Sequence, residues 1–123
     1  MQTVKRSELV HNQTFYFTER PSIHITSINA DVVEGQRHTI ACSISCISDI
    51  TGITWIKTNA TGDKIAIVVG EDGKFSGGTL SDPSLTINNI AKSDEGTYAC
   101  IAKHCFGTIS SEDSVLTGKG QFL

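Results

Sequence analysis

The side chains in this sequence that could carry out redox, metal or nucleophilic chemistry are four cysteines and four histidines. They are Cys42, Cys46, Cys100 and Cys105, and His11, His24, His38 and His104. The histidines fall in different predicted elements, and none stands in a recognisable pattern with a nucleophile and an acid. Zinc held by Cys46, His104 and Cys105 would lack a fourth ligand and the paired spacing of structural zinc sites. We therefore expect no catalysis, no cofactor and no metal.

Disulfide formation is the remaining chemistry, and it bears on the compartment. Four cysteines in a small domain favour an oxidising environment, because cytosolic thiols are kept reduced. Asn12-Gln13-Thr14 and Asn59-Ala60-Thr61 match the N-glycosylation pattern. No apolar run is long enough for a membrane span, and residues 1–20 lack the apolar core of a signal peptide. The sequence predicts an extracellular fragment, secreted or part of an ectodomain, with no membrane insertion of its own.

Length and charge narrow the class further. The chain has 123 residues, 38% hydrophobic and 19% charged, which suits one folded domain. Its formal net charge is −3, and Lys5 and Arg6 form the one adjacent basic pair. A nucleic-acid partner is not expected, since phosphate binding requires clustered Lys and Arg.

The elements that must position these cysteines are short strands. Residues 38–46 form the clearest one, with Ile40, Cys42, Ile44 and Cys46 predicted to point inward by strict alternation. Other strands are predicted at 23–25, 31–34, 53–57, 64–69, 85–87, 97–103 and 108–117. Eight or nine short strands separated by regular turns predict an all-β sandwich or barrel.

The two ends differ from this pattern. Residues 1–20 are polar apart from Phe15-Tyr16-Phe17 and are predicted to be a linker or the end of a preceding domain. The alternative is a strand that extends a sheet edge. Residues 118–123 are predicted to be a C-terminal tail.

One constellation resembles a known family. Cys42, Trp55 and the run Asp94-Glu95-Gly96-Thr97-Tyr98-Ala99-Cys100 resemble the C…W…D-x-G-x-Y-x-C signature of the immunoglobulin superfamily. The resemblance covers residues 21–117 and implies an immunoglobulin-like two-sheet antiparallel Greek-key sandwich. It is similar to the intermediate set, with some variable-like features, of invertebrate multi-domain cell-surface proteins.

The resemblance assigns roles to several of these residues. It implies a Cys42–Cys100 bridge packed on Trp55, and a tyrosine corner at Tyr98. Lys74-Phe75-Ser76-Gly77 resembles a strand of variable-type domains whose basic residue pairs with the acid of the Asp94-x-Gly96 motif. A Lys74–Asp94 ion pair is therefore expected, contributing about 0.2–1 kcal/mol if it is exposed to solvent.

The other two cysteines follow the first pair at similar offsets. In the fold that the resemblance implies, Cys46 and Cys105 lie at the same end of the sandwich, beside the BC and FG loops. A second bridge between them is the natural pairing, provided that Cys105 turns inward. Such a bridge would prepare a rigid binding tip, or it would only add stability.

The function implied by the resemblance is recognition of a protein partner or cell adhesion, with a second copy of the same chain as one candidate partner. Contact is expected through the G-F-C-C′ face or the BC and FG tip, with a glycan on Asn59 fringing that face. The candidate contact residues are Ile56, Lys57, Lys103, His104 and Phe106. One alternative is a secreted immune module that binds microbial surface glycans; the other is a structural domain of a giant muscle-type protein.

Overall fold

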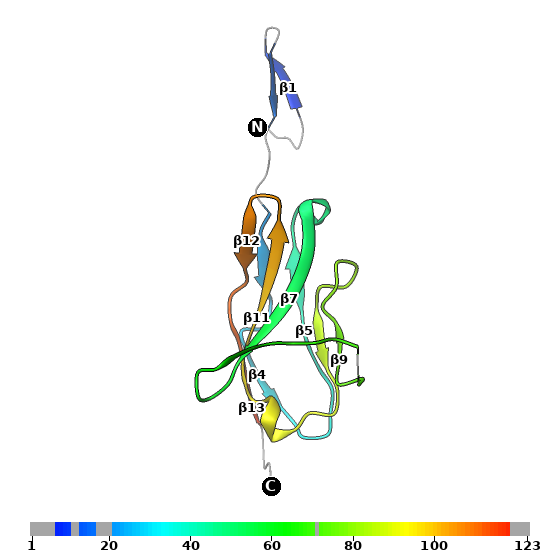
Figure 1. Cartoon of the computed structure of the whole chain (residues 1–123), viewed down its shortest axis with the longest axis vertical. Helices are drawn as coiled ribbons and strands as arrows, with labels where there is room; N and C mark the ends of the chain where they lie inside the picture. Colours follow the sequence, from blue (N-terminus) through cyan, green and yellow to red (C-terminus); the bar gives the residue numbers. More distant parts are fainter. Residues whose placement is uncertain (1–6, 11–12, 17–20, 71, 119–123) are drawn as a thin grey trace.

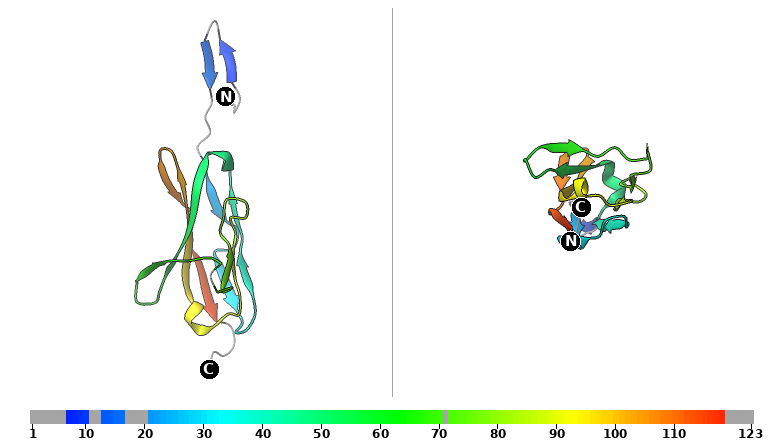
Figure 2. Two further views of the ribbon diagram at one scale, coloured as in Figure 1. Left: turned by 45° about the vertical axis from the view of Figure 1, so that its right-hand side comes forward. Right: turned by 90° about the horizontal axis from the view of Figure 1, so that it is seen from below.

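The strands between Ile23 and Gly118 form two layers packed face to face, which confirms the all-β immunoglobulin-like sandwich (Figures 1 and 2). The computed structural model describes residues 7–10, 13–16, 21–70 and 72–118. Besides strands, these residues form two 3₁₀ turns, η1 (Ile47–Asp49) and η2 (Lys92–Asp94). No helix among them is long and apolar enough to cross a membrane.

The larger sheet is named the β11 sheet after its central strand. Its order is β4 (Asn29–Val32), β13 (Ser114–Gly118), β11 (Gly96–His104), β7 (Ile50–Thr58) and β8 (Lys64–Ala66), and β12 (Gly107–Ser110) also pairs with β11. The β4–β13 pair is parallel, whereas the other pairs are antiparallel. The parallel pair arises because the first strand of the domain crosses from one layer to the other and then runs beside the last strand.

The opposite layer is named the β10 sheet. It contains β5 (His38–Ile40), β10 (Leu85–Ile87) and β9 (Phe75–Gly77), and β3 (Ile23–Ile25) pairs with β6 (Cys42–Ile44). The predicted strand 38–46 is thus interrupted at Ala41 and ends at Ile44. The interruption has a local cause, because the Cys42 N–H is donated to the Ser84 side chain, 2.9 Å away, rather than to a neighbouring strand.

Strand alternation places the core between the layers. The fully buried side chains include Trp55, Tyr98, Ile40, Leu85 and Ile87. Burying each large apolar side chain contributes about 1.5–3 kcal/mol, so this layer is the main source of stability.

Several strand boundaries differ from the sequence prediction, including the start of β7, which lies at Ile50 rather than at residue 53. The strand expected at 31–34 lies at 29–32, the one expected at 64–69 ends at Ala66, and 108–117 divides into β12 and β13. The split falls where Ser111 donates its backbone N–H to the Cys100 carbonyl and accepts the Cys100 N–H on its side chain. Residues 7–16, predicted to lie in a linker or preceding domain, contain a hairpin of β1 (Ser7–Val10) and β2 (Gln13–Tyr16).

Candidate functional site

Cys42 and Cys100 meet in the core, one from each sheet. Trp55 lies directly opposite Cys100 across the β7–β11 pair, and its indole donates to the Pro83 carbonyl at 2.9 Å. The two cysteine side chains are hydrogen-bonded to one another. That hydrogen bond lowers the pKa of Cys42, while the same contact and burial raise the pKa of Cys100. Two sulfurs in contact, one completely buried, have the arrangement that oxidation would convert to the expected bridge.

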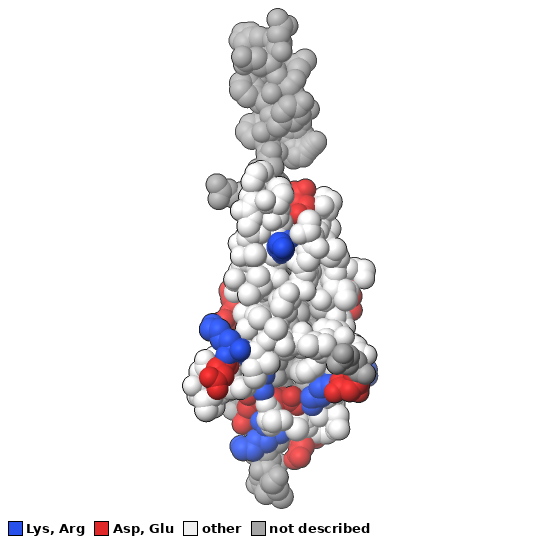
Figure 3. Space-filling view, in the orientation of Figure 1, with Lys and Arg blue, Asp and Glu red and all other residues white. Residues whose placement is uncertain are grey.

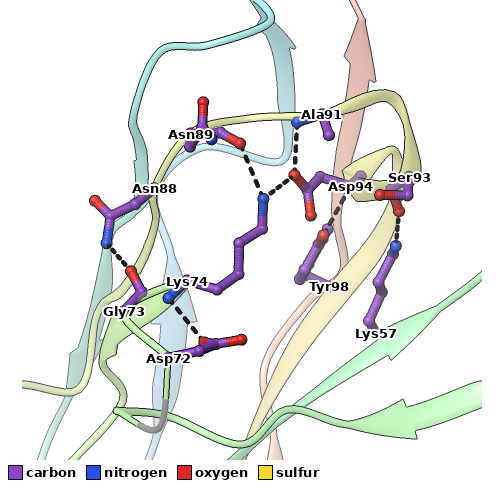
Figure 4. Close-up of polar contacts among 10 residues, drawn as sticks. All are labelled: Lys57, Asp72, Gly73, Lys74, Asn88, Asn89, Ala91, Ser93, Asp94 and Tyr98. Carbon is purple, nitrogen blue, oxygen red and sulfur yellow. Dashed lines mark hydrogen bonds and ion pairs between the residues drawn. The ribbon is translucent and has the colours of Figure 1, made fainter.

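Asp94 organises the corner between β10 and β11 (Figure 4). Its carboxylate accepts from the Lys74 ammonium at 2.6 Å and from the Ala91 N–H at 2.7 Å. The Tyr98 hydroxyl donates to the Asp94 backbone carbonyl at 2.7 Å, and burial raises the pKa of that hydroxyl. The expected ion pair is present, but Asp94 is only 4% exposed, so the small value for a solvent-exposed pair does not apply.

Gly96 has a steric role in the same corner. Its φ is +151°, and a Cβ atom on it would lie 2.8 Å from the Thr58 carbonyl oxygen on the neighbouring strand. The glycine of the motif therefore lets β11 approach β7 closely at the point where the two strands begin to pair.

Lys57, one of the expected contact residues, is directed into this corner. It shares the inner side of the sheet with Tyr98, its cross-strand neighbour, and its ammonium lies 5.9 Å from the centre of the Tyr98 ring. The ammonium donates to the Ser93 carbonyl, and burial lowers the pKa of Lys57. Lys57 therefore faces the opposite side of the sheet from Ile56, because adjacent strand residues alternate, and its charge is already engaged.

The other three expected contact residues gather at the turn between β11 and β12. Lys103 and Phe106 are exposed, and His104 is half-buried. Lys103 pairs with Thr108 and His104 with Gly107, leaving Cys105 and Phe106 as the two turn residues. This turn lies about 20 Å along β11 from Ala99, the cross-strand partner of Ile56, given about 3.3 Å per residue. The five expected contacts thus occupy three places: the outer face at Ile56, the inner corner at Lys57, and the β11–β12 turn.

Cys46 and Cys105 both lie at this end of the sandwich. Cys46 was expected to be the last inward residue of a strand, but it lies beyond β6 with φ 55° and ψ 44° and precedes η1. The chain must turn there to begin β7, and the turn is stabilised by a hydrogen bond in which the Asp49 N–H donates to the Cys46 carbonyl at 2.9 Å. Cys105 is exposed on the β11–β12 turn. The Cys46–Cys105 bridge remains a prediction.

The outer surface of the β11 sheet carries almost no charge at its centre. Ile56 lies opposite Ala99, and Thr54 lies opposite Ile101 on adjacent strands. These four residues, here named the sheet face, are exposed or half-exposed and alternate with the buried Trp55 and Cys100. Figure 3 shows a broad uncharged area over β7, β11 and β12, while most charged residues gather toward the opposite end of the molecule. Of the four, sequence reasoning had selected Ile56 alone.

The two glycosylation motifs differ in what can be described. Asn12 lies outside the described residues. Asn59 is half-exposed in the turn between β7 and β8, where its N–H donates to the Asp63 carbonyl at 2.8 Å and its carbonyl accepts from Gly62 at 2.9 Å. The turn lies at the end of β7 that is remote from the β11–β12 turn.

The described residues contain no group of three or more His, Cys, Asp or Glu side chains that could hold a metal ion. In particular, Cys46, His104 and Cys105 do not gather as a ligand set there.

The fold, the Trp55 core and the Tyr98 corner together define an immunoglobulin domain, and sequence comparison gives the same result. Residues 20–104 match the family described as Immunoglobulin domain, so this chain belongs to that family. A relative among curated proteins is human hemicentin-1, which is 30% identical over 96 residues. The aligned part is 78% of this chain but 2% of hemicentin-1, so the chain spans a small part of that relative.

Proposed function

We propose that this immunoglobulin domain is a non-catalytic, extracellular recognition module of the adhesion type. It binds a protein partner through the sheet face of Thr54, Ile56, Ala99 and Ile101. The observation that carries this proposal is the uncharged, half-exposed centre of the β11 sheet. Depletion of charge at the centre and a polar rim are what protein interfaces share.

The same chemistry favours a second copy of this chain as the partner. When two copies meet about a two-fold axis, each patch contacts its own equivalent, so a strongly charged patch would repel itself. The sheet face avoids this because it holds threonine, alanine and isoleucine, with Lys103 at its margin. Alternating β-branched side chains also present a regular surface on which an equivalent sheet can pack.

The extracellular placement is supported by the cysteines and by Asn59. The contact of Cys42 with Cys100 suits an oxidising compartment. A glycan on Asn59 would lie at the β7–β8 turn, at one edge of the sheet face, and would leave Ile101 and the β11–β12 turn uncovered.

Sedimentation of the full chain over a range of concentrations tests the proposal, with matched threonine variants in the two sheets. Thr54→Lys places a charge in the sheet face, whereas Thr39→Lys places the same charge on the exposed side of the β10 sheet. We expect concentration-dependent dimers for the parent and Thr39→Lys. For Thr54→Lys we expect dimerisation at least about tenfold weaker, because like charges across an interface cost several kcal/mol.

Three results would contradict the proposal. They are a parent chain that stays monomeric at every concentration, equal weakening by both variants, or retention of the parent on microbial polysaccharide that Thr54→Lys does not reduce. The last result would support the alternative of a microbial-surface module.

A further inference from the structure

The outer side of the β11 sheet is uncharged at its centre (Figure 3) but carries opposite charges at its two edges. Asp31 lies on this side of β4, because the next residue, Val32, is buried in the core. Lys64 lies on the same side of β8, because it pairs with Thr58, which alternates with the inward-facing Lys57. Since β4 and β8 are the outermost strands, the sheet has an acidic edge and a basic edge on the side that contains the sheet face.

These two charges are not used within the domain. Asp31 and Lys64 are exposed, and neither forms an ion pair with another residue in the part of the chain that the structure describes. Lys103, at the end of β11, is the other charged side chain on the outer side of the strands of this sheet. Asp31 and Lys64 are therefore available to pair with a second molecule.

The two edges are too far apart to neutralise each other within one copy. Four strand spacings of about 4.8 Å separate β4 from β8, which is about 19 Å in all. Cross-strand pairs connect Lys64 to Asn29 through Thr58, Thr97 and Val115. Asp31 is two residues beyond Asn29, a step of about 7 Å along β4. Lys64 and Asp31 thus lie on opposite edges at nearly the same level of the sheet.

A two-fold axis that runs along the strands brings these opposite edges together. When two sheets pack face to face about such an axis, the β8 edge of each copy lies over the β4 edge of the other. Each Lys64 then lies near Asp31 of the second copy, and the step of about 7 Å is shorter than the screening length of about 8 Å at physiological salt. An axis across the strands would place β8 over β8 and β4 over β4, so neither charge would gain a partner.

We infer that two copies of this chain pack their sheet faces together with their strands running in the same direction, each Lys64 facing Asp31 of the other copy. This inference rests on the proposed function and adds the orientation of the dimer and the residues that select it. Two attractive contacts form in each dimer. Because β11 is the central strand, the two Lys103 side chains face each other near the axis and make one repulsive contact.

Sedimentation of the full chain over a range of concentrations tests this orientation, with charge reversals at the two edges. We expect Lys64→Glu and Asp31→Lys each to weaken dimerisation at least about tenfold, because like charges then meet at both edges. The double variant that carries both substitutions should dimerise within about twofold of the parent, since the two charges have only exchanged places. The control is Arg37→Glu, which changes the charge as Lys64→Glu does but precedes β5 in the opposite layer, and it should dimerise like the parent.

Lys103→Ala distinguishes the two possible directions of the strands. In the inferred orientation it removes the one repulsive contact, so we expect dimers to be about twofold tighter or more. If the strands ran in opposite directions, Lys103 would face the level of Thr97 in the second copy, and the substitution would change dimerisation little.

A parent dimer that Lys64→Glu weakens no more than Arg37→Glu does would overturn the inference. A double variant that stays monomeric, or Lys103→Ala dimers no tighter than the parent, would also overturn it. The proposed function would survive these results as long as the parent dimerises and Thr54→Lys does not. A parent that stays monomeric at every concentration would instead overturn the proposed function, and this orientation with it.

Discussion

Replacing Asp94 by Asn should produce a large loss of stability, because it removes one charge of a buried pair and keeps the shape of the side chain. Lys74 would lose its 2.6 Å carboxylate partner and keep the Asn89 carbonyl at 3.0 Å. Removing one partner of a buried pair costs about 3–5 kcal/mol. Since the Lys74 side chain is 27% exposed, water recovers part of this, and we expect a loss of about 2–3 kcal/mol.

Urea unfolding followed by fluorescence measures this loss directly, because Trp55 is the single tryptophan and is 1% exposed. The control is Asp72→Asn, an exposed carboxylate in the same corner that accepts one backbone N–H from Lys74. We expect the control to cost less than about 1 kcal/mol.

A double-mutant cycle with Lys74→Met should give a coupling energy above about 1 kcal/mol. Coupling near zero, or equal losses in Asp94→Asn and Asp72→Asn, would refute the reasoning that the buried pair fixes this corner.

Three further outcomes follow from the structure. The buried Nε2 of His38 has no hydrogen-bond partner, and burial lowers the pKa of His38 below its usual value of 6.5. As the pH falls below about 6.5, the unfolded chain therefore binds the proton more readily than the folded chain, and the stability of the fold should decrease. Urea midpoints measured at pH 7.5 and 5.5 should show this decrease, and His38→Leu should make it smaller. Gly96→Ala should cost about 2 kcal/mol in thermal unfolding, whereas Gly52→Ala, which meets nothing within 4 Å, should cost less than half as much. Non-reducing mass spectrometry should show Cys42 joined to Cys100, and reduction should remove about 4 kcal/mol of stability; free thiols at both positions would contradict the extracellular assignment.

The fold could be predicted from the sequence because it depends on local strand alternation and on the spacing of a few motif residues. Alternation identified the strands, and the spacing of Cys42, Trp55 and Tyr98 implied which of them face the core. The Lys74–Asp94 contact was expected from a motif on each side. The contribution of this ion pair to stability could not be predicted, because the burial of Asp94 depends on how η2 and its neighbours pack in the folded domain, and no local sequence pattern reveals that.

The binding surface was harder to predict, because it depends on which strands become neighbours. Thr54, Ala99 and Ile101 carry no distinctive chemistry, and only the β7–β11 register brings them together. Strict alternation would have separated Ile56 from Lys57, since adjacent strand residues face opposite sides. The αL turn at Cys46 was also missed, because the local alternation pattern continues past the point where the strand ends.

Mixing two oppositely charged variants tests the central claim, recognition through the sheet face, most directly. Thr54→Lys and Thr54→Glu should each remain monomeric in sedimentation at concentrations where the parent dimerises. An equimolar mixture of the two should restore dimers, because opposite charges then meet across the same interface. A mixture that stays monomeric, or single variants that dimerise like the parent, would contradict the claim.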